Sequence, residues 1–474
     1  MAVKQFDLVI LGWGAAAFAA AIKASELTSG GATVAMVGRG RIGGTCVNVG
    51  CVPSKYLLEA SHLVFNPRHP RMPGIEAVEL RLDFGKVMDG LRAYVDHARS
   101  TKYEEVIRSY PNVTLIEGLG SFLDNRTLKV EGPSGGEVSG SQVIIATGST
   151  PTVPKIEGLE EAGYLTSDTL WNLTELPLRV AIIGGGAIGL EMGQALLHFG
   201  AEVTVVEALD SLLPQAEPEI GEALKKRLEE EGIRFHLRAR VGSAGISPDG
   251  KYVEVITHSG RHRVAVDEII VATGRRPNTG TLNLEAAKVR TDERGLIVTD
   301  RAMRTSSAGI YAAGDCVSKS LFLETLAARE GVVAVSNMFG QEVEIDHGSA
   351  TWAVFTYPQV AGVGLTEKEL SRRNGSCSFR TLALANLTKA SIMGETDGLV
   401  KITVDPKDHK IVGMQIFSPG AADIITEGAY AVRHGYTVDD IIATSHIFPS
   451  LSEGVKLAAQ SFVRDISRMS CCVE

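Results

Sequence analysis

Cysteine is scarce in this sequence, and other features that mark common protein classes are missing. Six cysteines in 474 residues are too few for a disulfide scaffold of this length. No dense lysine or arginine run occurs and the net charge is −9, so we expect no nucleic-acid partner. The apolar stretch at residues 8–22 is too short for a membrane span, and the preceding Asp7 and the interrupting glycines do not fit a secretion signal. We therefore expect a cytoplasmic protein that does not enter a membrane.

Glycine is plentiful, with 51 residues that often cluster after apolar runs. A chain of 474 residues suits two to four domains. Residues 6–11 form an apolar, β-prone run that ends at Gly12-Trp13-Gly14, and an alanine-rich stretch to about Leu27 precedes a second β-prone run at residues 33–37. This order predicts a strand, a glycine turn, a helix and a strand, which together make one βαβ unit.

The same order returns in the middle of the chain. Residues 180–183 predict a strand, residues 184–189 a glycine turn, and a helix to about Phe199 precedes a strand at residues 202–206. Two βαβ units this far apart predict two dinucleotide-binding domains. Further strands are expected to end at Ala146-Thr147-Gly148, at Ala272-Thr273-Gly274 and at Ala312-Ala313-Gly314-Asp315.

The pattern changes from about residue 345, where strand-like segments at residues 353–355, 398–403 and 411–417 mix with helices near residues 421–434 and 452–462. Such a mixture predicts a separate α+β domain. We therefore predict an α/β protein with two Rossmann-like domains and a C-terminal α+β domain. The first Rossmann-like domain comprises residues 1–150 and 276–345, the second comprises residues 151–275, and the last domain comprises residues 346–474.

Each glycine turn is a candidate pyrophosphate site, because it lets the backbone approach a phosphate at a helix N-terminus. The candidate positions are Gly12, Gly14 and Ala17 in the first turn and Gly184, Gly186 and Gly189 in the second. Such a site also needs an acid after the second strand, to bond a ribose hydroxyl. Glu207 meets this need in the second unit, whereas the first unit has Gly38. A carboxylate repels a 2′-phosphate and no arginine follows in residues 208–214, so we predict that NADH is accepted.

The most specific segment is Gly-Gly-Thr-Cys-Val-Asn-Val-Gly-Cys-Val-Pro-Ser-Lys at residues 43–55. Cys46 and Cys51 stand ahead of a helix that is expected to open at Pro53, since proline is tolerated in a first turn. Thiols near a helix N-terminus have lowered pKa values and become good nucleophiles, and Lys55 adds a positive charge. The pair is therefore a candidate redox dithiol. The alternatives are a structural disulfide, which does not suit a reducing cytoplasm, and a zinc half-site, which usually has a second cysteine pair.

Residues 43–55 resemble the active-site segment of the pyridine nucleotide-disulphide oxidoreductases, and the resemblance extends over both βαβ units and the last domain. It implies a glutathione-reductase-like fold, FAD in the first unit, NADPH or NADH in the second, and a homodimer held by the C-terminal dimerisation domain. It also implies that Cys51 is the thiolate near the flavin and that Cys46 is the outer, exchanging thiol. Lys55 would pair with Glu191 near the flavin, and Asp315 would bind the flavin side chain. Further cofactor-binding positions that it implies are Gly40, Thr45, Ala146, Gly148, Gly274 and Leu323.

The C-terminal segment favours one branch of this family. Its thiol–disulfide members carry a histidine immediately before a proline, as a general acid/base toward the leaving thiol, but here Phe448 precedes Pro449. His446 is interpreted as a packing or interface residue. The adjacent thiols of Cys471 and Cys472 suit a carrier of a soft, thiophilic metal ion, and this tail resembles that of mercuric reductases.

The resemblance to mercuric reductases implies reduction of Hg(II) to Hg(0), with the metal delivered as a thiol complex. The tail pair of one subunit would pass it to the inner pair of the other, so the active site would be shared. The expected metal ligands are Cys46, Cys51, Cys471 and Cys472. Ser450 and Ala187 depart from the tyrosines found in many mercuric reductases. A dihydrolipoamide dehydrogenase, or a flavoprotein that binds Hg(II) without turnover, are the alternatives.

Overall fold

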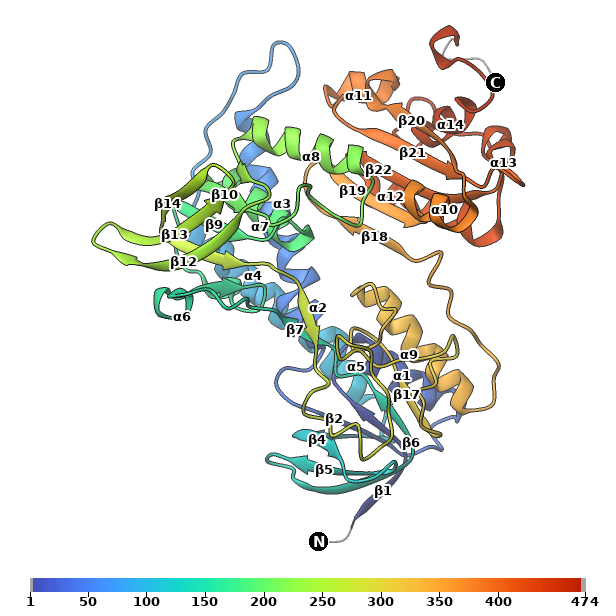
Figure 1. Ribbon diagram of the computed structural model, residues 1–474. Coiled ribbons are helices and arrows are strands. Elements are labelled where there is room, and N and C mark those ends of the chain that lie inside the picture. Colours follow the sequence, from blue (N-terminus) through green and yellow to red (C-terminus); the bar gives the residue numbers. More distant parts are fainter. Residues whose placement is uncertain (1–2, 470–474) are drawn as a thin grey trace. The chain divides into compact units, whose positions relative to one another are not determined.

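The computed structural model describes residues 3–469 (Figure 1). The chain divides into two compact units, each built from three stretches of sequence. The first unit contains residues 1–54, 89–152 and 274–347, and the second contains residues 55–88, 153–273 and 348–474. No helix in the described part of the chain is both long and apolar enough to cross a membrane.

A mainly parallel sheet forms the centre of the first unit, with the strand order β3-β2-β1-β6-β5-β4, and β17 also pairs with β6 (Figure 1). Its strands are β1 (Lys4–Leu11), β2 (Val34–Gly38), β3 (Val113–Glu117), β4 (Leu119–Phe122), β5 (Thr127–Glu131), β6 (Gly136–Ile145) and β17 (Ile310–Ala312). Two of its pairs are antiparallel, β4 with β5 and β5 with β6. The central strands are continuous apolar runs because both faces of a parallel sheet are covered, and Val9, Ile10 and Val143 are fully buried.

Helices connect the parallel strands of the first unit. They are α1 (Ala15–Leu27), α2 (Gly44–Val49), most of α4 (Phe84–Arg99), the π-helix η2 (Ser100–Glu104), α5 (Glu105–Arg108) and α9 (Glu324–Met338). The helix α3 (Cys51–Phe65) begins in the first unit, and most of its residues belong to the second. The helix α1 makes the crossover between the parallel strands β1 and β2. It packs closely on α9, since a side chain at Gly331 of α9 would collide with the Ala16 carbonyl. A short ribbon pairs β7 (Ser149–Pro151) with β16 (Arg275–Pro277).

The second unit contains a parallel sheet of order β11-β10-β9-β15-β8, an antiparallel sheet β12-β13-β14 and an antiparallel sheet of order β18-β19-β22-β21-β20. The strands of the first two are β8 (Leu165–Thr166), β9 (Arg179–Ile183), β10 (Glu202–Val206), β11 (Arg234–His236), β12 (Arg240–Ser247), β13 (Gly250–Thr257), β14 (Gly260–Val266) and β15 (Glu268–Val271). The third sheet contains β18 (Thr351–Val354), β19 (Gln359–Gly364), β20 (Ser378–Ala383), β21 (Leu399–Val404) and β22 (Ile411–Ser418).

Eight α-helices lie within the described part of the second unit. They are α6 (Leu159–Ala162), α7 (Ala187–Phe199), α8 (Pro218–Glu231), α10 (Glu367–Asn374), α11 (Thr388–Met393), α12 (Ala421–His434), α13 (Val438–Ala443) and α14 (Glu453–Gln460). The short 3-10 turns of the chain are η1 (Asn66–Arg68), η3 (Leu170–Asn172), η4 (Leu384–Asn386) and η5 (Ile466–Arg468). A core of apolar residues joins α12 and α14 to the third sheet, and Ile425, Val455 and Ile402 belong to it.

A buried ammonium group ties α8 to the third sheet inside the second unit. The Lys401 side chain is 1% exposed, and its Nζ lies 3.2 Å from Glu217, 2.6 Å from Glu219 and 3.0 Å from Glu367. Burial of a charge is costly unless partners compensate it, and three carboxylates do so here. These contacts fix the start of α8, the helix that follows β10 along the chain.

Both predicted βαβ units are present, with every boundary within two residues of the prediction. The strand predicted to end at Gly148 ends at Ile145, because the chain turns at Gly148, where φ is +67°. The three strands that we predicted after residue 345 are also present as β18, β21 and β22, and the predicted helix at residues 421–434 is α12. The division into four sequence segments stays a prediction.

Candidate active site

Cys46 and Cys51 lie at the junction of two helices in the first unit. Cys46 is in α2, and Cys51 is the first residue of α3. Gly50 allows the chain to return closely, because a Cβ at this position would lie 3.2 Å from the Cys46 Cα. The predicted helix start at Pro53 is two residues too late, since the Ser54 N–H already donates to the Gly50 carbonyl at 3.1 Å. Pro53 therefore lies in the first turn of α3 but is not its first residue.

The two thiols differ in their surroundings. They form no disulfide in this structure, and Cys46 is partly buried whereas Cys51 is exposed. The hydrogen bond to Cys51 raises the pKa of Cys46, and burial and the negative charges of Cys51 and Glu324 raise it further. The prediction of a lowered pKa is therefore wrong for Cys46, because its neighbours are thiol and carboxylate groups. Cys51, at the N-terminus of the longer helix α3, is better placed to become the thiolate.

Tyr103 and Glu324 complete the surroundings of the dithiol, and sequence reasoning missed both. The Tyr103 ring, in η2, lies 5.0 Å from the Phe18 ring and nearly perpendicular to it, and it also covers Gly43. Burial raises the pKa of Tyr103 to about 12, together with the charges of Cys46 and Glu324, so its hydroxyl keeps the proton. No motif marks either residue. The π-helical turn that carries Tyr103 is often found at functional sites but has no sequence signature.

The first glycine turn packs tightly against neighbouring backbone. Gly12 has a φ of +132°, and a Cβ there would collide with the Ala146 carbonyl. Gly14 faces Gly44, where an added Cβ would lie 2.5 Å from the Gly14 Cα. The turn therefore lies between the end of β6 and the start of α2, so the predicted pyrophosphate site and the dithiol segment are neighbours.

Asp315 is held in place by a hydrogen-bond network in the first unit. The Ser149 hydroxyl donates to Asp315 Oδ2 at 2.6 Å, and Arg275 Nε donates to the same hydroxyl at 2.7 Å. The N–H of the preceding Gly314 donates to the fully buried Glu330 carboxylate at 2.7 Å. Glu330 therefore fixes the loop that presents Asp315, a role for which the sequence gives no signal.

The surroundings of the first turn fit a dinucleotide. Thr147 Oγ1 is buried and has no hydrogen-bond partner among the described residues. Added side chains at Gly40 and Gly148 would meet open space. Buried polar atoms normally find a partner, so a free hydroxyl beside a glycine turn suits a bound phosphate or sugar. The other predicted positions of this unit are Ala17 in α1, Thr45 in α2, Leu323 just before α9, and Gly274 after β15.

The second glycine turn is closed by Glu207. Its Oε2 accepts the Gly185 N–H at 2.6 Å, and its Oε1 accepts the Leu209 N–H at 2.7 Å. Gly184 and Gly189 have no room for side chains, whereas Gly186 borders open space at the start of α7. The carboxylate is therefore fixed at the turn, next to the place where a helix N-terminus receives a pyrophosphate.

Lys55 and Glu191 form an ion pair in the second unit. Lys55 Nζ lies 2.8 Å from Glu191 Oε2 and 4.3 Å from the centre of the Phe355 ring. The other carboxylate oxygen accepts the Phe355 N–H at 2.9 Å. The Glu191 side chain is 6% exposed and that of Lys55 is 33% exposed, so the pair has one buried and one accessible end.

The segment before α14 offers no proton-transferring group at the position where thiol–disulfide enzymes have histidine. Phe448 precedes the cis-proline Pro449 and is 47% exposed. His446 is turned away toward Glu427, with Nε2 2.8 Å from a carboxylate oxygen, and this pair raises the pKa of the imidazole. Ser450 Oγ accepts the Glu453 N–H at 3.2 Å at the start of α14. Cys471 and Cys472 lie outside the described residues.

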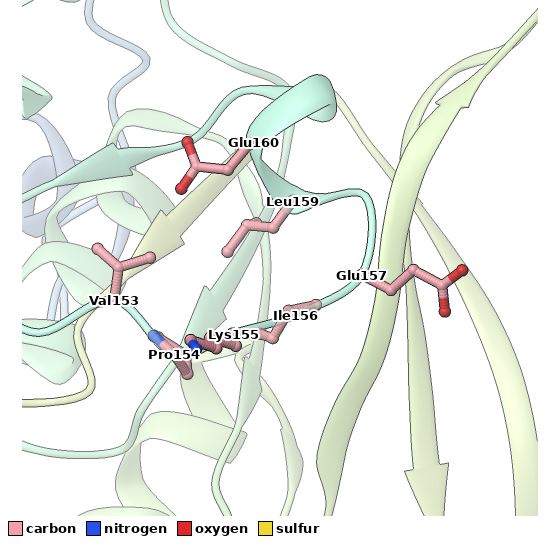
Figure 2. Close-up of a pocket in the computed structure, with 7 residues that line it drawn as sticks. All are labelled: Val153, Pro154, Lys155, Ile156, Glu157, Leu159 and Glu160. Carbon is pink, nitrogen blue, oxygen red and sulfur yellow. The ribbon is translucent and has the colours of Figure 1, made fainter.

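A cavity of 380 Å³ opens in the second unit near β12 (Figure 2). Its lining is residues 153–157, Leu159 and Glu160. Figure 2 shows the carboxylates of Glu157 and Glu160 pointing to different sides, so they do not converge on a ligand. None of the predicted site residues lines it. Among the described residues, no group of three or more histidine, cysteine, aspartate or glutamate side chains could hold a metal ion.

Comparisons with known proteins agree with this geometry. The family "Pyridine nucleotide-disulphide oxidoreductase" matches residues 6–334, and its dimerisation domain matches residues 350–459. The chain belongs to the pyridine nucleotide-disulphide oxidoreductase family. Its fold class is therefore as predicted, and as a member of this family it is an oxidoreductase that uses FAD and a nicotinamide cofactor.

Relatives of this oxidoreductase span nearly its whole length. A mercuric reductase of Lysinibacillus sphaericus is 38% identical over 99% of this chain and 84% of its own. A mercuric reductase of Streptomyces lividans is 38% identical over 98% of both chains. Among solved structures, the Cu(II) complex of the HOCl-induced flavoprotein disulfide reductase RclA from Escherichia coli has a TM-score of 0.84 at 26% identity, covering 98% of this chain and 100% of that one. LpdA from Mycobacterium tuberculosis has a TM-score of 0.85 at 27% identity, with the same coverage.

Proposed function

We propose that this oxidoreductase reduces Hg(II) to Hg(0) with electrons from NAD(P)H, as a mercury detoxification enzyme of the cytoplasm. The observation that carries the proposal is a dithiol without an imidazole partner: Cys46 and Cys51 are paired, while Phe448 stands before Pro449. Reduction of an organic disulfide releases thiols that need protons. Reduction of a thiolate-bound metal ion needs none. The full-length similarity to mercuric reductases supports the same choice.

The residues of the first unit hold both partners of the electron transfer. When bound, FAD takes a hydride equivalent from the nicotinamide and passes on two electrons. Gly12, Gly14 and Asp315 would hold it through its pyrophosphate and side chain. Cys46 and Cys51 bind Hg(II) as two sulfur ligands, and Cys46 must lose its proton first because its pKa is raised. Metal binding therefore releases a proton from this site. After two electrons have reached the metal, Hg(0) no longer binds the sulfurs and leaves.

Lys55 and Glu191 would organise the flavin end of the nicotinamide site. Glu191 is fixed by the Phe355 N–H and holds the Lys55 ammonium, so the charge has one defined position. A fixed positive charge stabilises electron density that develops on a neighbouring group. We place this group at the flavin, as the family resemblance implies.

The cofactor preference would follow from Glu207. The carboxylate accepts two backbone N–H groups, so it cannot swing away from a nucleotide. Arg238, whose N–H donates to the Leu209 carbonyl, is paired with Asp210 at 3.3 Å. The site therefore accepts NADH at least as well as NADPH.

Metal entry would use the C-terminal thiols. Cys471 and Cys472 exchange with the small thiols that carry Hg(II) and pass the ion to Cys46 and Cys51 of the partner subunit. The family match to a dimerisation domain at residues 350–459 suggests the homodimer that this transfer needs. The exposed Ile447 and Phe448, 78% and 47% exposed, lie in that part of the chain.

The test is an assay of the purified full-length protein with NADH and a thiol complex of Hg(II). We expect NADH consumption that depends on the metal, together with release of mercury vapour in equal amount. Lipoamide is the matched competitor substrate. Rapid lipoamide reduction without stimulation by Hg(II) would contradict the proposal in favour of a dihydrolipoamide dehydrogenase. Tight Hg(II) binding without vapour would instead indicate a flavoprotein that only sequesters the ion.

A further inference from the structure

The two glycine turns of this chain correspond residue by residue. In each, the first glycine N–H donates to the last buried residue of the second strand: Gly12 to Val37 at 2.7 Å, and Gly184 to Val206 at 2.9 Å. The residue that follows each first glycine therefore corresponds between the two turns, and so does the residue that follows each accepting valine. The first pair is Trp13 and Gly185, and the second pair is Gly38 and Glu207.

In the second turn, the large side chain comes from the strand end. Glu207 reaches over the turn, and its carboxylate accepts the Gly185 N–H at 2.6 Å. An added Cβ at Gly185 would lie 2.8 Å from Leu212 Cδ2 and 3.2 Å from the Cβ and Cγ of Glu207. Because position 185 is a glycine, the Glu207 side chain has room to lie against the turn.

In the first turn, this arrangement is reversed. The indole of Trp13 lies over Gly38, and an added Cβ at Gly38 would be 2.6 Å from two of its ring atoms. The indole Nε1 donates to the Met36 carbonyl of β2 at 3.3 Å, which holds the ring there. An acidic side chain therefore cannot occupy position 38, at the end of β2, while Trp13 is present. The residue that follows, Arg39, is exposed and cationic.

We propose that Trp13 takes the place of the ribose-binding acid in the flavin site, so that this site holds FAD without reading the 2′-hydroxyl of its adenosine ribose. The acid after the second strand is what normally bonds that hydroxyl. Here an apolar ring face stands at the same position and offers contact area in place of a hydrogen-bond acceptor. The inference rests on FAD binding by the family and is independent of the metal that is reduced.

The first experiment uses the unaltered protein. Apoprotein is titrated with FAD and with FAD that lacks the adenosine 2′-hydroxyl, and flavin fluorescence reports binding. A hydrogen bond to a charged group contributes roughly tenfold or more to affinity, so without one we expect the two affinities to agree within about threefold. The Glu207 site is the internal control, and there NADH lacking the same hydroxyl should bind roughly tenfold more weakly. A comparable loss at the flavin site would overturn the inference.

The second experiment exchanges the pair. Gly38→Glu alone should lower FAD affinity at least tenfold or so, because the new side chain meets the indole. Trp13→Gly/Gly38→Glu recreates the pair found at Gly185 and Glu207, and it should regain FAD binding and acquire sensitivity to the 2′-hydroxyl. Circular dichroism and NADH binding show whether each variant is folded. The inference is refuted if Gly38→Glu binds FAD like the parent, or if a folded double variant binds no better than Gly38→Glu.

Neither experiment involves mercury. A protein that binds both flavins equally but reduces no Hg(II) would contradict the proposed function and leave this inference standing. A protein that reduces Hg(II) but discriminates strongly between the two flavins would contradict this inference and leave the proposed function standing.

Discussion

At the scale of single residues, the chemistry of the dithiol depends on groups that are distant in sequence. Cys46 is partly buried, and its pKa is raised by its hydrogen bond to Cys51 and by the nearby Glu324. Such a thiol keeps its proton until a metal ion displaces it. The outer thiol is therefore protected against unspecific alkylation while it remains available to Hg(II).

Replacing Glu324 by glutamine should lower the pKa of Cys46, because a negative charge near the thiol is removed. The pKa of Tyr103 should fall as well, since the same carboxylate raises it. The check is the thiolate absorbance of the metal-free protein, followed against pH. Glu26→Gln removes the same charge from an exposed position of α1 and is the control. Identical titration curves for Glu324→Gln and the parent protein would contradict the prediction.

Replacing Glu207 by glutamine should raise kcat/KM for NADPH relative to NADH. The amide can still accept the Gly185 N–H, but it no longer repels a 2′-phosphate. We expect the ratio to rise by roughly tenfold, the effect of one removed charge at close range. Steady-state kinetics with both nucleotides measure it. Glu202→Gln, at the exposed start of β10, serves as the control and should leave the ratio unchanged.

At the scale of elements, α3 and α7 meet through a buried aromatic stack in the second unit. The Phe65 ring of α3 lies 3.8 Å from the His198 ring of α7, at an angle of 16°. His62, one turn before Phe65, lies 5.4 Å from the same histidine. The Glu231 carboxylate accepts a hydrogen bond from His198 Nε2 at 3.0 Å. Two histidines are thereby held within an apolar contact between helices.

This contact predicts a loss of stability in mild acid. Burial, and then the neighbouring His198, lower the pKa of His62 from 6.5 to about 4, and burial also lowers the pKa of His198. The unfolded chain therefore binds more protons below pH 6.5, so stability falls as the pH drops from 6.5 toward 4. The contribution of His62 between pH 7 and pH 5 is on the order of 2 kcal/mol.

Urea unfolding at several pH values measures this effect. His62→Gln removes the titrating ring and should flatten the stability profile between pH 7 and pH 5. His258→Gln, in the turn between β13 and β14, is the matched control. A profile that His62→Gln leaves as steep as before would show that other groups cause the acid sensitivity.

At the scale of the whole molecule, the proposed metal transfer needs two subunits. Cys471→Ala/Cys472→Ala should reduce Hg(II) turnover by tenfold or more when excess small thiol buffers the metal, because direct exchange at a partly buried Cys46 is slow. Flavin content and NADH oxidation by a small electron acceptor should stay unchanged and serve as controls. Equal turnover of the variant and the parent under thiol buffering would remove the tail from the mechanism.

Much of the fold could be predicted from the sequence because apolar runs and glycine turns are local signals. The β1–α1–β2 unit and its counterpart β9–α7–β10 have the predicted boundaries within two residues. The dithiol was visible for the same reason, as a compact motif at residues 43–55. The neighbours of the dithiol were not, since Tyr103 and Glu324 are joined to it only by the packing of η2 and α9. The predicted direction of the Cys46 pKa was wrong because the hydrogen bond to Cys51 and burial raise this pKa, and neither effect is visible in the spacing of the two cysteines.

In each turn one large side chain lies over a glycine: Trp13 over Gly38 in the first, and Glu207 over Gly185 in the second. This arrangement constrains how such sites can diverge. If both arose from a common nucleotide-binding template with an acid on the strand, the change to tryptophan could not come first, because the indole and the acid would compete for one volume. The open route passes through a state with glycine at both places, in which the ligand is gripped weakly. We expect some homologous chains to have glycine at both positions. We expect no homologous chain to have tryptophan at the first position together with an acid at the second.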